Sequence, residues 1–75
     1  MVSLKNYRWR KATDINREFA LFELMTDNVI LLDIGFSEEG ILEIAFHDGI
    51  AGLIVEWSKF KEIIEQGKKL AEADR

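Results

Sequence analysis

Between residues 18 and 57 the chain alternates apolar stretches with short turn signals, and this pattern limits the fold more than any other feature. The turn signals are rich in Asp, Asn, Ser and Gly, residues that favour tight turns. Because successive side chains of a strand point to opposite faces, the length of each turn decides which apolar residues share a face. The four stretches cover residues 18–25, 29–36, 41–47 and 50–57.

The last turn signal, Asp48-Gly49, lies directly between two apolar stretches. This dipeptide is the strongest short-range indication of a two-residue hairpin, because the turn needs positive φ at both central residues. We therefore expect the stretches on either side of it to pair as antiparallel strands, with His47 opposite Ile50.

The two earlier turn signals contain loops at residues 26–28 and 38–40, which have the length of three-residue hairpins. The last residue of such a loop adopts the left-handed conformation. Asn28 and Gly40 both tolerate it. The sequence thus predicts two further hairpins.

Together the three hairpins define a complete strand register. Phe22 is expected opposite Leu32, and Phe36 opposite Leu42, and opposed residues lie on the same face of a sheet. No loop length has to be adjusted to give one continuous apolar face. Its residues are Ala20, Phe22, Leu24, Ile30, Leu32, Ile34, Phe36, Leu42, Ile44, Phe46, Ala51, Leu53, Val55 and Trp57.

An apolar sheet face needs a cover, and the C-terminal residues have the pattern to provide it. From residue 60 to residue 71 apolar residues recur at helical spacing, with Lys and Glu between them. We expect a helix over about 58–74 with Ser58 as its N-cap. Gly67 falls on the apolar side of this helix, which indicates a close approach of the helix to the sheet.

These features predict an α+β fold, a four- or five-stranded antiparallel β-meander with one C-terminal α-helix packed on one face. Residues 1–75 would form a single small domain. Residues 1–16 would form either an edge strand or an arm, since aromatic and basic residues alternate at 7–10. An alternative interpretation starts the helix near Ile50 and leaves three strands, but the β-branched residues at 54–55 favour a fourth strand.

Composition narrows the class of protein. The formal net charge is −4, with five basic and one acidic residue in residues 1–17 and five basic and thirteen acidic residues in 18–75. An acidic body disfavours non-specific contact with nucleic acid. The chain has no cysteine, which excludes disulfides and thiolate metal sites and fits a cytoplasmic protein. No apolar run approaches the roughly 18 residues of a membrane span, so we expect no membrane association.

The second face of the predicted sheet mixes apolar residues with about one carboxylate per strand. This mixture is more typical of an interaction surface than of a solvated face. We expect self-association through this face, giving a homodimer; the alternatives are cover by the N-terminal segment and binding of a different protein. The candidate interface residues are Phe19, Leu21, Glu23, Leu31, Asp33, Ile41, Glu43, Ile54 and Glu56.

The resulting hypothesis is a small, non-enzymatic protein-interaction domain. Its size and its acidic body would also suit an inhibitor or neutralising partner of a basic protein. We predict no catalytic residue, no cofactor and no metal ligand. No glycine-rich phosphate loop is present.

Two alternatives come from other functional classes. The first is a small nucleic-acid-binding protein that uses the basic and aromatic run Arg8, Trp9, Arg10 and Lys11, because phosphate contacts and base stacking need these residue types. The second is an enzyme or metal site around His47, which is followed by Asp48 and could orient a proton transfer. Both are less favoured than protein binding.

Overall fold

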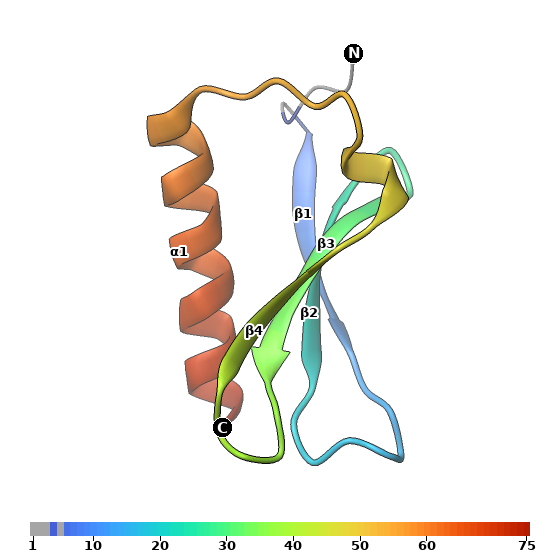
Figure 1. Ribbon diagram of the computed structural model, residues 1–75, viewed down its shortest axis with the longest axis vertical. Coiled ribbons are helices and arrows are strands. Elements are labelled where there is room, and N and C mark those ends of the chain that lie inside the picture. The colour runs from blue at the N-terminus through green and yellow to red at the C-terminus, as the bar shows by residue number, and fades with distance from the viewer. Residues whose placement is uncertain (1–3, 5) are drawn as a thin grey trace.

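A computed structural model of the 75-residue chain describes residue 4 and residues 6–75. It has one four-stranded antiparallel sheet and one C-terminal helix, which confirms the predicted α+β fold (Figure 1). The strands lie side by side in chain order, as a meander. The elements are β1 (Tyr7–Ala12), β2 (Leu21–Thr26), β3 (Val29–Phe36), β4 (Leu42–Phe46), the 3-10 turn η1 (Asp48–Ile50) and α1 (Trp57–Asp74). No helix in the described part of the chain is both long enough and apolar enough to cross a membrane.

The N-terminal segment forms an edge strand, not an arm, over residues 7–12. Strand β1 pairs with β2 so that Trp9 lies opposite Leu24 and Arg10 opposite Glu23. Basic side chains on this edge oppose pairing with another chain, which is a common protection of edge strands. Residues 1–3 and 5, which the prediction for residues 1–16 also covered, lie outside the described residues.

The hairpin between β3 and β4 has the predicted register. Phe36 pairs with Leu42, and Ile34 pairs with Ile44. Gly40 closes the loop with a φ of 79°, in the left-handed region that glycine adopts without steric cost. Loop length and the apolar alternation agree here, so the sequence specifies this register without ambiguity.

The hairpin between β2 and β3 differs from the prediction in two compensating ways. The turn has two residues, Asp27 and Asn28, both with positive φ (49° and 64°), as a type I′ turn requires. The pairing then shifts between residues 24 and 25, which leaves Leu31 of β3 as the extra residue of a β-bulge. Each change moves the register by one residue, so Phe22 pairs with Ile34 instead of Leu32 and still faces the core.

The predicted hairpin at Asp48-Gly49 is wrong. These residues begin η1, and Gly49 is not among the glycines with positive φ, which are Gly40 and Gly52. A Cβ on Gly49 would contact the Val29 side chain and lie 2.9 Å from the carbonyl oxygen of Ile30. Glycine is needed here because η1 packs closely on the start of β3, and not because of a hairpin turn.

The fourth predicted strand is also wrong, and so is the alternative of a helix that starts near Ile50. The residues up to the start of α1 at Trp57 form a connection without strand pairing. Leu53 and Val55 pack against the core, whereas Ile54 between them is 76% exposed. An extended chain on an apolar surface alternates in the same way as a strand. The connection crosses the end of the sheet to bring α1 onto its face, so it does not run alongside β4 (Figure 1).

Helix α1 covers one face of the sheet, and no other helix or strand of residues 6–75 covers the opposite face (Figure 1). Ile63, Gly67 and Ala71 are the buried residues of the helix, at the spacing predicted for its apolar side. Ile63 packs with Leu24 and Leu32 in the main core cluster. Each fully buried Leu or Ile stabilises the fold by roughly 1.5–3 kcal/mol relative to an exposed one. The helix begins one residue before the predicted start, and Ser58 is not its N-cap.

The C-terminal end of α1 is tied to the sheet by Asp74. Its carboxylate lies 2.6 Å from Lys11 Nζ, and it accepts a hydrogen bond from the backbone N–H of Ala20 at 3.3 Å. The side-chain hydrogen bond from Lys11, followed by the backbone bond from Ala20, lowers the pKa of Asp74 below its ordinary value. Both bonds favour the ionised carboxylate.

Candidate functional site

The outer edge of β4 is the feature of the fold that most resembles a binding site. The Ser37 N–H donates to the Ile41 carbonyl, and the His47 N–H donates to the Leu31 carbonyl. Hydrogen-bonded and non-hydrogen-bonded residue pairs alternate along an antiparallel pair of strands. The odd-numbered residues of β4 therefore direct their N–H and C=O groups to β3, and the even-numbered residues direct theirs away from the sheet. In the described part of the chain no strand pairs with this outer edge. The outward backbone groups belong to Leu42, Ile44 and Phe46.

The side chains of this edge are apolar and exposed. Ile44 is 41% exposed and Phe46 is 63% exposed, although both point to the face that α1 covers elsewhere. The strand carries a single charge, on Glu43, whereas β1 at the other edge carries three basic residues. Long, apolar and uncharged edges invite pairing with another chain. The residue pattern of β4 is therefore that of an interior strand, placed at an edge.

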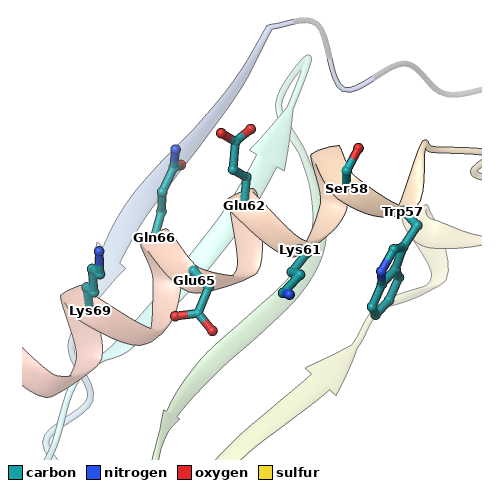
Figure 2. Close-up of a pocket in the computed structure, with 7 residues that line it drawn as sticks. All are labelled: Trp57, Ser58, Lys61, Glu62, Glu65, Gln66 and Lys69. Carbon is teal, nitrogen blue, oxygen red and sulfur yellow. The ribbon is translucent and has the colours of Figure 1, made fainter.

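The tryptophan at the start of α1 lies on the β4 side of the helix. Trp57, Lys61 and Glu65 point to the side on which β3 and β4 lie (Figure 2). Gln66 points the opposite way and accepts a hydrogen bond from the Tyr7 hydroxyl of β1 at 2.9 Å. The Trp57 side chain is 74% exposed. A large exposed aromatic on the side of the open strand adds to the apolar surface there.

A hollow of about 470 Å³ lies along the outer side of α1, and it is not a convincing ligand site. Its lining residues all come from one helix, as Figure 2 shows, so it has no opposite wall. Small-molecule sites are concave and enclose most of the ligand surface. The lining residues are Trp57, Ser58, Lys61, Glu62, Glu65, Gln66 and Lys69.

The open face of the sheet carries two adjacent carboxylates, and each has a partner within the chain. Glu23 and Asp33 lie directly opposite each other on β2 and β3. Arg10 lies 2.5 Å from the Glu23 carboxylate, and His47 Nε2 lies 2.8 Å from Asp33 Oδ2. Each carboxylate side chain is only 13% exposed. Each of the two carboxylates thus has a nitrogen-bearing side chain beside it, Arg10 for Glu23 and His47 for Asp33.

His47 therefore has a partner within the fold, the Asp33 carboxylate. The neighbouring hollow, lined by residues that include Arg17, Asp33 and Glu43, contains no hydroxyl or thiol side chain. A histidine–carboxylate pair needs such a nucleophile for covalent catalysis. No group of three metal-ligating side chains occurs among residue 4 and residues 6–75. Nothing in this geometry favours the alternative of an enzyme or metal site.

The nine residues predicted as an interface do not form one surface. Leu31 is fully buried, because the bulge turns it into the core together with Leu32. Ile54 and Glu56 lie in the connection before α1, outside the sheet. The others remain on or beside the open face, where two of the expected carboxylates, Glu23 and Asp33, have partners within the chain. They are Phe19, Leu21, Glu23, Asp33, Ile41 and Glu43.

The basic N-terminal run is also engaged within the fold. Arg8 donates to Asn28 Oδ1 at 3.1 Å, and Arg10 and Lys11 form ion pairs with Glu23 and Asp74. The Trp9 ring packs against Gly67 beneath α1. A ring held in this way does not offer the open face that base stacking requires. The geometry therefore gives the nucleic-acid alternative little support.

Comparison of the chain with models of protein families, with curated proteins and with solved structures finds no match. The candidate site rests on the geometry of this chain alone. The sequence pattern did not indicate the β4 edge, because residues 50–57 were expected to form a strand that would cover it. The signal that could have indicated it is the three apolar residues on one side of β4, which need a neighbour in any arrangement.

Proposed function

We propose that this protein is a non-enzymatic protein-interaction domain that binds an extended polypeptide segment along β4. The observation that supports the proposal is the outward-facing backbone of Leu42, Ile44 and Phe46, combined with the exposure of the Ile44 and Phe46 side chains. Addition of a strand to an open sheet edge uses backbone hydrogen bonds for affinity and alternate side chains for specificity.

The charge of the domain favours some partners over others. Residues 18–75 hold thirteen acidic and five basic residues, so their net charge is −8. An acidic surface raises the rate at which basic segments are encountered. A role as an inhibitor or neutralising partner of a basic protein is compatible with this proposal. The cysteine-free composition fits a cytoplasmic protein, and this location is part of the proposal.

A library of random extended peptides, selected against the wild-type protein, tests the proposal. We expect selected peptides to alternate apolar and polar residues and to slow amide exchange at Leu42, Ile44 and Phe46. Phe46→Lys should abolish their binding, because a lysine on an edge strand opposes pairing. Ile15→Lys is the matched control, since Ile15 is fully exposed in the loop before β2. Peptides that protect amides elsewhere, or that bind Phe46→Lys as well as wild type, would refute the proposal.

A further inference from the structure

We propose that the chain bound along β4 is a second copy of this protein, paired antiparallel so that Ala45 lies opposite the partner's Ala45. This inference rests on the function proposed above and names the partner. The residues from 43 to 47 are Glu, Ile, Ala, Phe and His, an order that is complementary to its own reverse. Reversal places acid against imidazole and apolar against apolar, around one small central residue.

The backbone geometry permits this register. Ile44 and Phe46 direct their N–H and C=O groups outward, and the two-fold arrangement places each opposite the other in the second copy. Such pairs exchange N–H···O=C bonds. Ala45 directs its backbone to β3, so the central Ala45 pair is the closely spaced, non-hydrogen-bonded kind. A small residue suits that position, and Ala45 is exposed in the single chain.

The charges agree with the same register. Glu43 lies opposite His47 of the second copy, and the two-fold axis repeats this pair. In the described part of the chain Glu43 is exposed and has no ion-pair partner. His47 contacts Asp33 through Nε2, which leaves Nδ1 as the ring nitrogen for a second carboxylate. When both ring nitrogens carry a proton, the imidazole can donate to both carboxylates, and the cross-strand pair is then one of opposite charges, which stabilises a sheet.

A register shifted by one residue, centred on Ile44, is less favourable. It places Glu43 opposite Ala45, so the acid has no partner directly across the strands. It also pairs Phe46 with Leu42, which packs with the core of its own chain and is less accessible than Ile44. The exposed apolar side chains of the two copies would then not form one continuous surface. Of these two registers, the one centred on Ala45 pairs Glu43 with His47 and also pairs the exposed apolar side chains of Ile44 and Phe46.

The paired strands would join two sheets into one. The exposed Ile44 and Phe46 side chains of both copies would form an apolar floor between the two helices. Trp57 points from α1 to the β4 side and could cover part of that floor (Figure 2). The β1 edge cannot substitute for β4, because its basic residues would meet like charges in a symmetric pair.

Cross-linking tests the register directly, because the natural chain has no cysteine. Opposed residues of a non-hydrogen-bonded pair have Cα atoms about 4.5 Å apart, within the range of about 4.4–6.8 Å found in disulfides. We expect Ala45→Cys to form an intermolecular disulfide under mild oxidation at least about tenfold faster than the exposed control Ile15→Cys. Equal rates for the two variants would overturn the proposed register.

Charge variants at the two-fold axis provide an independent test. Ala45→Lys or Ala45→Glu alone would place two like charges opposite each other and weaken dimerisation about tenfold or more. An equal mixture of the two should restore it, as measured by sedimentation between about 5 and 500 μM. In the register centred on Ile44, Ala45→Lys would instead strengthen the dimer, by facing Glu43.

The outcomes separate this inference from the proposed function. A wild-type protein that stays monomeric throughout that concentration range would overturn the dimer. If selected peptides still protect the β4 amides, the proposed function remains and only the identity of the partner is wrong. If neither copies nor peptides occupy β4, both proposals fail.

Discussion

The Trp9 ring lies directly against Gly67, which has no side chain to hold the ring away from the helix backbone. A Cβ at Gly67 would lie 2.6 Å from Cζ2 of the Trp9 indole and closer still to Cη2. The close approach that Gly67 suggested in the sequence is therefore confirmed, and β1 supplies the group that needs the space. This contact also places the aromatic ring of the basic run beneath α1.

Gly67→Ala should destabilise the protein although alanine favours helices by about 1 kcal/mol over glycine. The added methyl group must displace a packed indole, and overpacking costs about 1–3 kcal/mol. Urea unfolding measures the change. Lys69→Ala, at an exposed position of the same helix, is the control and should change stability by less than about 0.5 kcal/mol. An increase in stability for Gly67→Ala would contradict the close contact.

The type I′ turn at residues 27–28 should depend on the residue type at position 28. Asn28→Val should destabilise the protein by about 1–2 kcal/mol, because a β-branched side chain strains a backbone with φ of 64°. Asn28→Gly should add no backbone strain, since glycine adopts positive φ freely. Glu38→Val, in the other hairpin loop and without positive φ, is the matched control. Equal thermal stability of Asn28→Val and Glu38→Val would argue against the observed turn.

Gly49→Ala should destabilise the protein through packing, not through φ. The new methyl group would contact the Val29 side chain and the Ile30 carbonyl oxygen, which cannot move without distorting β3. We expect a loss of about 1–3 kcal/mol in chemical denaturation. Val29→Ala combined with Gly49→Ala should recover part of that loss by removing one contact. No recovery in the double variant would indicate that the backbone contact dominates.

Asp74 should stabilise the protein in a pH-dependent way. Its pKa is lower in the folded state than its ordinary value, so its contribution is present at neutral pH and disappears as the pH falls through the folded-state pKa. Asp74→Asn should therefore be less stable than wild type at pH 7, and the difference should vanish in acid. Urea unfolding at a series of pH values measures it. A difference that stays constant from neutral to strongly acidic pH would contradict the ion pair with Lys11.

The coupling energy between Arg10 and Glu23 should be larger than is usual for an exposed ion pair, because the Glu23 side chain is mostly buried. Arg10→Met leaves Glu23 beside Asp33 without its cation, and like charges directly opposite are destabilising. We expect a loss of about 1 kcal/mol, at the upper end of the range for surface pairs. Arg10→Met with Glu23→Gln should regain most of it. A double-mutant cycle with no coupling energy would show that the pair is solvated and independent.

Different parts of the fold were predictable to different degrees, for physical reasons. The β3–β4 hairpin was predicted because loop length, Gly40 and the alternation of residues all require one register. The β2–β3 hairpin was predicted with the wrong pairing; the predicted face is right for Phe22 and Ile34 but wrong for Leu31. A two-residue turn and a bulge at Leu31 together restore the parity that a three-residue loop would give.

The candidate site was less predictable than the fold. The apolar residues of β4 were predicted to lie in a strand, but residues 50–57 were expected to form a further strand that pairs with its outer edge. Leu53 and Val55 alternate with exposed residues, as a strand would, and the sequence pattern cannot distinguish pairing from packing on the core. The nine residues expected as an interface do not form one surface, because the bulge buries Leu31 and because Ile54 and Glu56 lie in the connection outside the sheet.

The sequence by itself determined the class of fold, the faces of the strands and the helix that covers one of them. These follow from local periodicity and turn chemistry, which act between residues close in the chain. Only the tertiary structure decided that residues 50–57 do not pair with the outer edge of β4. That choice depends on how the connection reaches α1 across the end of the sheet, a long-range constraint without a local pattern. The edge left open by that choice, with Ile44 and Phe46 exposed, is where we place the function of this protein.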